Sequence, residues 1–188
     1  MRILDLRPRS VRFMSSLWSG GKHIRGFLPA DPGPGHLLGR LAGRVADGLA
    51  ARRVAGRSRK SGGPFLVSVG NLALGGTGKT PVVTALAVDL AAQGIKGAIL
   101  TRGFGSPLAG PLAVSPDNIL AGDEARMMAA ALVPVGWPVV QAKRRHLGLD
   151  FLRQEHPGIE VVIVEDGHQT AGIGRDLDVV ILDAWTLV

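Results

Sequence analysis

The sequence predicts an α/β fold, a mainly parallel sheet with helices on both faces, and two observations lead to it. Apolar stretches of strand length alternate with amphipathic stretches of helix length through residues 65–182, a pattern typical of parallel sheets covered by helices. A glycine-rich turn ending in Gly78-Lys79-Thr80 follows the first apolar stretch, as a phosphate-binding loop (P-loop) does. The predicted architecture is therefore P-loop NTPase-like, preceded by a basic amphipathic N-terminal helix.

Charge divides the chain into two regions. Residues 1–62 carry 13 basic and 3 acidic side chains, a net charge of +10, whereas residues 63–188 carry 9 and 12, a net charge of −3. We expect a basic N-terminal arm over 1–62 and one P-loop domain over 63–188. The arm favours an anionic partner such as a phospholipid surface. With 5 Phe, 3 Trp and no Tyr, the chain lacks the aromatic platforms that bind single strands, so no nucleic acid partner is expected.

Residue types and hydropathy exclude several other classes. Cysteine is absent, which excludes disulfides, cysteine-ligated zinc and thiol catalysis. No apolar run is long enough to span a bilayer, and the first residues lack the apolar core of a signal peptide. The sequence therefore predicts a protein that stays on the cytoplasmic side of the membrane.

The N-terminal arm has two parts. Through residue 35, glycines and prolines interrupt every potential helix, so this part is expected to be irregular. Residues 36–54 are expected to form a helix, because five apolar residues recur there at helical spacing: Leu37, Leu38, Leu41, Val45 and Leu49. Such a helix either lies in a membrane interface or packs on its own domain, and the pattern alone leaves both open.

The P-loop itself is expected between a strand that begins at Phe65 and a helix over residues 81–94. Its glycines let backbone N–H groups converge on phosphate oxygens, and the helix adds its positive dipole end. Lys79 is expected on the β- and γ-phosphates of ATP, and the Thr80 hydroxyl on Mg²⁺. Ala73 stands where the general pattern has its first glycine. The predicted nucleotide-binding residues are Gly75, Gly76, Thr77, Gly78, Lys79 and Thr80.

Six further elements follow the P-loop. Strands are expected over residues 96–101, 137–141, 159–164 and 177–182, and helices over residues 122–132 and 144–155. In such folds the ligand crevice lies at the carboxyl ends of the strands.

Acidic residues fall where that crevice is expected. Asp123 and Glu124 open the helix after residue 121, and Asp123 is either a functional carboxylate or the helix N-cap. Glu165 and Asp166 follow a buried strand, where P-loop proteins hold Mg²⁺, although an Asp-Gly pair also favours a plain turn. Arg102 follows another strand end and is expected to face an anionic group.

Taken together, these motifs resemble one known family. The stretches are Val69-Gly-Asn71, Leu74-Gly-Gly-Thr-Gly-Lys-Thr-Pro81, Thr101-Arg-Gly-Phe-Gly105, Gly122-Asp-Glu124, Glu165-Asp-Gly-His-Gln169 and Arg175-Asp176. In this order they are similar to the tetraacyldisaccharide 4′-kinases. The resemblance implies Mg-ATP-dependent phosphorylation of the 4′-hydroxyl of lipid A disaccharide 1-phosphate, at the cytoplasmic face of the bacterial inner membrane, with that anionic membrane as a partner.

The resemblance also implies residue roles. Lys79 acts on the ATP phosphates, and Asp123 is the base that accepts the sugar hydroxyl proton. Thr80, Glu124, Glu165 and Asp166 form the metal site. Asn71, Arg102 and Gln169 are assigned to the substrate.

This chain departs from the family pattern at the acidic pair and in length. The family usually has two aspartates followed by Gly-Phe-Gln-His, whereas this chain has Glu165, His168 and Thr170 in place of the first aspartate, the phenylalanine and the histidine. Family members also continue well beyond residue 188, so the P-loop kinase domain is expected to be incomplete here. The alternatives are a membrane-associated P-loop ATPase or a nucleotide-dependent binding module. Leu74 argues against the partitioning type of ATPase, which has a lysine at that position.

Overall fold

The computed structural model describes residues 3–6, 34–54, 63–71, 78–167 and 173–183. Seven strands form one sheet in the order β1-β7-β2-β6-β3-β5-β4. The strands are β1 (Ile3–Leu6), β2 (Phe65–Asn71), β3 (Gly97–Thr101), β4 (Leu112–Ala113), β5 (Val139–Gln141), β6 (Val161–Glu165) and β7 (Leu177–Asp183). All neighbouring pairs are parallel except β4 with β5. The predicted mainly parallel sheet is confirmed.

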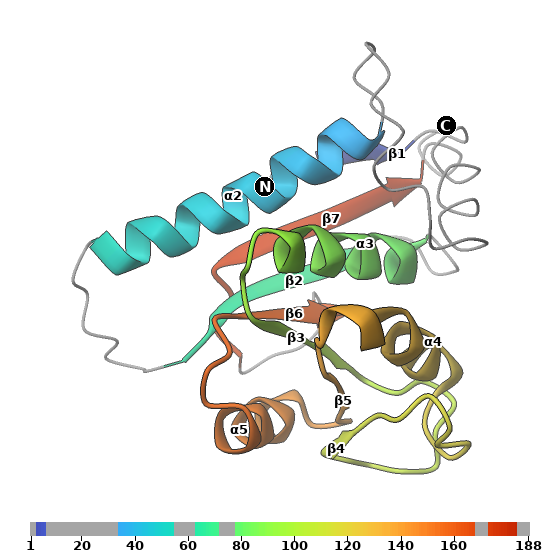
Figure 1. Cartoon of the computed structure of the whole chain (residues 1–188). Helices are drawn as coiled ribbons and strands as arrows, with labels where there is room; N and C mark the ends of the chain where they lie inside the picture. Colours follow the sequence, from blue (N-terminus) through green and yellow to red (C-terminus); the bar gives the residue numbers. More distant parts are fainter. Residues whose placement is uncertain (1–2, 7–33, 55–62, 72–77, 168–172, 184–188) are drawn as a thin grey trace.

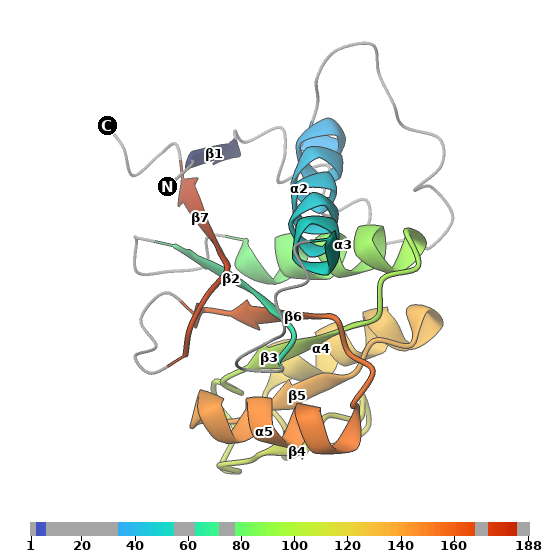
Figure 2. The same ribbon diagram turned by 90° about the vertical axis from the view of Figure 1, so that its left-hand side faces the viewer.

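Helices cover both faces of the sheet, as predicted (Figure 1). The helices are α2 (Pro34–Val54), α3 (Lys79–Ala92), α4 (Asp123–Leu132), the short 3₁₀ helix η1 (Val133–Val135) and α5 (Arg145–Glu155). Helices α3 and α4 share one core cluster with the strands, and α5 packs over a second cluster that includes Leu100, Val140 and Val162. The second view separates these layers (Figure 2). Strands β2, β3, β5 and β6 therefore contribute side chains to both cores, which explains their continuous apolar runs.

Helix α2 forms an outer layer on α3 (Figure 2). Leu38, Leu41, Val45 and Leu49 are buried in the core cluster that α3 shares. A Cβ atom added at Gly48 would lie 3.1 Å from the ring of Phe65, so the helix also approaches the start of β2 closely. Of the two readings left open by the sequence, the structure shows the apolar face packed on the chain's own domain. None of the described helices combines the length and hydropathy needed to cross a bilayer.

Two strands differ from the sequence prediction. Strand β1 lies in the stretch expected to be irregular, where Ile3 to Leu6 pair with Val180 to Asp183 of β7. The open edge of β7 supplies the hydrogen-bond partners for this pairing, and local periodicity carries no sign of so distant an edge. Strand β4, in the long connection before α4, likewise depends on its antiparallel partner β5.

Candidate active site

Four strands end at the same edge of the sheet, and two of them end in predicted site residues, Asn71 and Glu165. Asn71 ends β2, Thr101 ends β3, Gln141 ends β5 and Glu165 ends β6. Helices α3 and α4 both begin at this edge, directly after Gly78 and Gly122. The site is therefore built where parallel strands place their carboxyl ends, as expected for this fold class.

Lys79 is held between two of the predicted residues. Its Nζ donates a hydrogen bond of 2.8 Å to Asn71 Oδ1 and lies 3.7 Å from Asp166 Oδ1. Gly78, which precedes the helix, has a φ of 74°, a left-handed conformation that favours glycine. Thr80 is buried in the first turn of α3, and its carbonyl accepts a hydrogen bond from Thr84 Oγ1. The P-loop lysine is thus pre-positioned beside an acidic residue.

The remaining predicted nucleotide-binding residues, Gly75, Gly76 and Thr77, lie outside the described residues, as does Gln169.

The acidic pair divides into one buried and one partly exposed carboxylate. Glu165 is buried, and its Oε2 accepts a hydrogen bond of 2.8 Å from Thr101 Oγ1. Burial raises the pKa of Glu165, the hydrogen bond from Thr101 opposes this rise, and the nearby Glu124 carboxylate adds to it. Asp166 has a φ of 53°, which turns its carboxylate toward Lys79. Glu165 is thus a buried carboxylate bonded to Thr101, whereas Asp166 is partly exposed and lies beside Lys79.

Asp123 opens α4 without capping it. The N-cap residue is Gly122, so of the two alternatives left open for Asp123 the structure excludes the N-cap. The Asp123 carboxylate is 92% exposed, and Oδ1 lies 3.6 Å from Arg126 Nη1 one turn later. Glu124 lies close enough to Glu165 to affect its pKa, and Arg102 is exposed after β3.

Sequence reasoning missed Arg145, a buried guanidinium behind the acidic pair. Its Nη1 donates to the carbonyl of Ala142 and its Nη2 to the carbonyl of Glu165, both at 2.9 Å. Burial lowers the pKa of Arg145, and Glu165 acts in the opposite direction. Arg145 therefore fixes the backbone at the ends of two strands. Among three consecutive basic residues, no local signal marked it as the buried one.

Gln141 was also missed, and it holds the connection between β3 and α4. This fully buried side chain accepts from Gly122 N at 3.0 Å and donates to Ser106 Oγ and the carbonyl of Leu108. A Cβ atom at Gly103 would lie 2.0 Å from Gln141 Cδ, so the loop wraps directly around this amide. A polar residue at the end of an apolar strand was the available signal.

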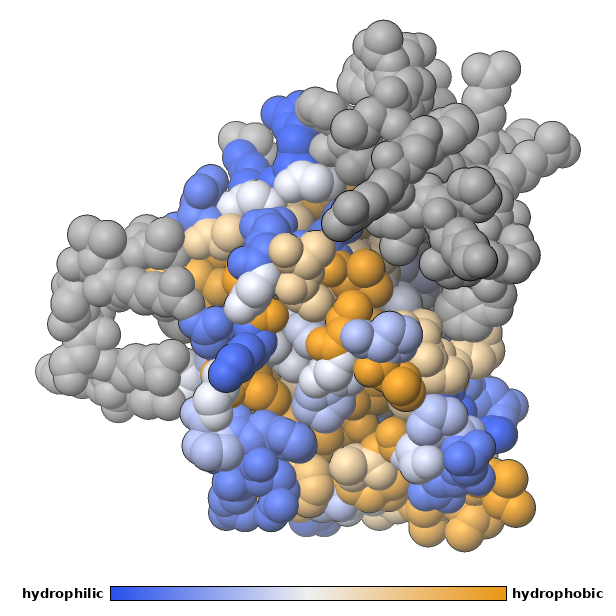
Figure 3. Space-filling model, viewed as in Figure 1, coloured by the Kyte–Doolittle hydropathy of each residue, from blue (hydrophilic) through white to orange (hydrophobic). Residues whose placement is uncertain are grey.

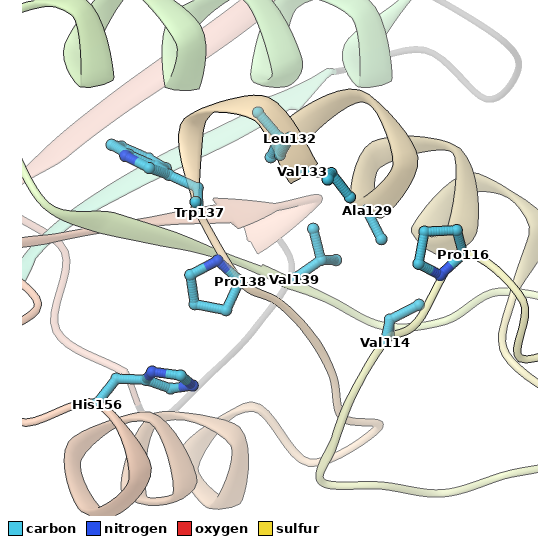
Figure 4. A pocket seen from close by; sticks show the side chains of 10 residues that line it. Val114, Pro116, Ala129, Leu132, Val133, Trp137, Pro138, Val139 and His156 are labelled. Carbon is cyan, nitrogen blue, oxygen red and sulfur yellow. The ribbon is translucent and has the colours of Figure 1, made fainter.

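A separate apolar cavity of about 260 Å³ lies away from these residues. Figure 4 shows Leu132, Trp137 and Val139 around it, with His156 at one side. Val139 begins β5 whereas Gln141 ends it, so the cavity is at the opposite end of that strand. None of the predicted site residues lines it.

Known proteins resemble this chain over most of its length. The tetraacyldisaccharide 4′-kinase of Chromobacterium violaceum is 39% identical over 165 residues, which is 85% of this chain and 46% of that protein. The enzyme of the same name from Nitrobacter winogradskyi is 37% identical over 156 residues, 80% of this chain and 44% of the relative. The chain thus spans about half the length of the curated relatives it matches.

A solved structure of a similarly related protein has a similar fold. LpxK from Aquifex aeolicus, crystallised in complex with ATP, is 29% identical and superposes with a TM-score of 0.58 over 81% of this chain and 48% of that one. The model of the tetraacyldisaccharide-1-P 4′-kinase family matches residues 37–188. The chain therefore belongs to the tetraacyldisaccharide-1-P 4′-kinase family.

Proposed function

We propose that this chain carries the nucleotide-binding part of a kinase that transfers the γ-phosphate of ATP to the 4′-hydroxyl of a tetraacylated disaccharide 1-phosphate, a step of lipid A biosynthesis. Family membership supports this activity, and the names of the relatives supply the substrate class. The observation that carries it is the placement of Asp123, an open carboxylate at the same sheet edge as Lys79.

Asp123 suits the role of general base because a hydroxyl can reach it from solvent. A positioned carboxylate that accepts the proton as the oxygen attacks phosphorus contributes roughly 10²- to 10⁴-fold to the rate. Its ion pair with Arg126, 3.6 Å long, leaves the carboxylate exposed. Arg102, exposed at the end of β3, supplies positive charge for a phosphate of either substrate. We assign Asn71 to hold the Lys79 ammonium, and we keep Gln169 as a proposed substrate contact.

The nucleotide is proposed to bind where α3 begins. Gly78 N–H and the positive end of α3 favour an anion, and Lys79 is close enough to both Asn71 and Asp166 to move between them and a phosphate. Positioning and charge neutralisation are the main contributions of a protein to phosphoryl transfer. The loop with Gly75, Gly76 and Thr77 is proposed to complete this cradle.

The donor set at this edge fits Mg²⁺, which takes one or two carboxylates besides phosphate oxygens and water. Asp166 and the Thr80 hydroxyl would hold the ion, with Glu165 and Glu124 as nearby carboxylates. When bound, the ion would neutralise charge on the phosphates. Among the described residues no group of three or more His, Cys, Asp or Glu side chains is arranged to hold a metal.

The acylated substrate implies work at a membrane, and we propose the cytoplasmic face of the inner membrane as the location. The basic residues of the N-terminal region support contact with anionic headgroups. On α2, Arg40 and Arg44 are exposed while the leucine face is buried, so this helix would meet the surface through charge.

The test is transfer of labelled γ-phosphate from Mg-ATP to detergent-solubilised tetraacyldisaccharide 1-phosphate. We expect Asp123→Asn to lower transfer by about 10²- to 10⁴-fold with ATP affinity nearly unchanged. Asp117→Asn, another exposed acid in the preceding loop, is the matched control and should leave both unchanged. Transfer retained in Asp123→Asn would contradict the base assignment. If the chain binds ATP but transfers nothing, the assay is repeated with a chain of the relatives' length; failure there as well would favour a nucleotide-dependent binding module.

A further inference from the structure

Asp166 is the one non-glycine residue in the described part of the chain whose φ is positive, at 53°. Residues with a side chain rarely adopt this left-handed conformation, and the surrounding structure must hold a residue that does. The conformation brings the carboxylate to the P-loop lysine, with 3.7 Å between Asp166 Oδ1 and Lys79 Nζ. The contacts that hold the Asp166 backbone therefore also set the geometry of the candidate site.

The peptide group that precedes Asp166 is fixed at both of its polar atoms. Its carbonyl, which belongs to Glu165, accepts a hydrogen bond of 2.9 Å from Arg145 Nη2. Its N–H, which belongs to Asp166, donates to the carbonyl of Val69 at 2.8 Å. These two bonds fix the plane of the peptide but leave the rotations about the backbone bonds of Asp166 open. A second fixed point after Asp166 is needed to set its conformation.

Arg175 supplies that second fixed point. Its Nη1 donates to the carbonyl of Gly167 at 3.1 Å, and its Nε lies 3.2 Å from Asp178 Oδ1 in an ion pair. The guanidinium is planar, so a carboxylate on one edge orients the donor on the other. A Cβ atom at Gly167 would lie 2.8 Å from Ser68 Oγ, so the same backbone also lies directly against β2. Only the backbone bonds of Asp166 and Gly167 lie between the two fixed points.

The backbone next to Arg175 is itself attached to the sheet. The N–H of Asp176 donates to the carbonyl of Leu66 at 2.9 Å, and Asp176 Oδ2 accepts from the N–H of Leu66 at 2.8 Å. Because β2 lies between β6 and β7, the bond from Arg175 to Gly167 joins the end of β6 to the start of β7 across β2. The guanidinium therefore reaches Gly167 from an anchored position.

We propose that Arg175 is a positioning residue for phosphoryl transfer: it holds the Gly167 carbonyl and so keeps Asp166 in the left-handed conformation that faces Lys79 and the proposed Mg²⁺ site. This assignment rests on the proposed function, since the nucleotide and the ion give that conformation its purpose. Arg175 acts through Asp166 and not on the reacting atoms. Residues that orient a metal ligand in this way typically contribute roughly 10- to 100-fold to metal affinity or activity.

The first experiment observes the Asp166 backbone by NMR, without nucleotide or metal. The cross-relaxation between the amide proton and Hα of one residue is strong at positive φ, because the two protons lie closest there. We expect a strong Asp166 cross-peak in the wild-type chain and a clearly weaker one in Arg175→Met. Arg175→Lys keeps the charge but lacks the planar fork that reaches both partners, so it should also weaken the peak, and it decides if Arg175→Met does not fold. A cross-peak of wild-type strength in the folded variants overturns the proposal.

Arg153→Met is the matched control. Arg153 Nη1 pairs with Asp150, three residues away, at 2.8 Å on α5, so the control also removes an arginine from an ion pair of that spacing. Hydrophilic side chains gather at the lower left of Figure 3, where Figure 1 shows α5. We expect the Asp166 cross-peak to stay at wild-type strength in this variant. An equal weakening in both variants would mean that Arg175 has no specific hold on Asp166 and would overturn the proposal.

A second measurement compares ATP binding with and without Mg²⁺ by calorimetry. We expect Arg175→Met to reduce the factor by which Mg²⁺ tightens ATP binding roughly tenfold, with the affinity for metal-free ATP close to wild type. A purely structural role would lower both affinities alike, and that result would overturn the proposal. Neither readout needs phosphoryl transfer. A chain of the relatives' length that shows both effects but transfers nothing would therefore contradict the proposed function alone, whereas wild-type transfer by Arg175→Met would contradict the role of Arg175 alone.

Discussion

The two sides of the candidate site differ in how many hydrogen bonds and ion pairs their side chains already form within the chain. Around β2 and β6, Lys79, Asn71, Thr101, Glu165 and Arg145 form hydrogen bonds or ion pairs with one another or with backbone carbonyls. At the start of α4, Asp123 has one weak ion pair and apolar neighbours exposed to solvent. We call the first side the prebuilt side, because internal hydrogen bonds and ion pairs already position its side chains. This suits a nucleotide, whose phosphates always have the same shape. The second, which we call the open side, remains accessible, as suits the acylated substrate proposed above.

Removing Arg145 should disturb the prebuilt side most. Arg145→Met leaves the backbone carbonyls of Ala142 and Glu165 without this donor, and we expect a loss of about 2–4 kcal/mol in the free energy of unfolding. Urea unfolding followed by circular dichroism measures this loss. Arg144→Met, at the exposed neighbouring position, should change stability by less than about 0.5 kcal/mol. Equal effects of the two substitutions would mean that Arg145 does not anchor the strand ends.

Gln141 links the two sides, so its replacement should affect both stability and transfer. Gln141→Met keeps the volume but removes one acceptor and two donor contacts, and we expect a loss of about 1–3 kcal/mol. We expect transfer to fall with ATP affinity preserved, because α4 loses the anchor at Gly122. Hydrogen exchange at the Gly122 amide should become faster. An unchanged exchange rate would separate Gln141 from the placement of Asp123.

Glu165 makes the prebuilt side sensitive to pH. Because burial raises its pKa above 4.5, the folded chain binds a proton more readily than the unfolded chain, and the free energy of unfolding falls as pH rises through the raised pKa. Glu165→Gln removes this dependence and keeps an acceptor for Thr101. In the absence of nucleotide, we expect the variant to melt above wild type at pH 8 and with it below pH 4. A constant difference at every pH would refute the assignment.

The smallest change in the free energy of unfolding is expected at the open side. Arg126→Gln removes the exposed ion pair with Asp123, which should cost less than about 0.5 kcal/mol. Thermal unfolding at low and high salt measures this contribution. A loss of stability larger than that of Gln141→Met would show that internal contacts fix the start of α4 as firmly as the prebuilt side. The contrast between the two sides would then not hold.

The sequence predicts some residues of the candidate site and misses others on both sides of it. The P-loop, the acidic pair and Asp123 follow from residue types at strand and helix ends, which local pattern reveals. Arg145 and Gln141 gain their roles only in the folded chain, since they bond to groups of segments distant in sequence, such as the Glu165 carbonyl and the Gly122 amide. Strand β1 required the edge of β7 for the same reason. The exposure of Phe104 and Ile119 was likewise hidden, because apolar residues in a loop are indistinguishable from buried ones until the chain is folded.

The position of β2 in the sheet has a consequence for synthesis. Strand β2 lies between β6 and β7, and Leu66 N donates to Asp176, 110 residues later in the chain. On the ribosome, the P-loop is translated long before the two strands that flank β2. Pairings this distant form slowly because a long loop must close first. A nascent chain should therefore gain protection by ATP only after β7 has left the exit tunnel, so nucleotide acts on the last stage of folding.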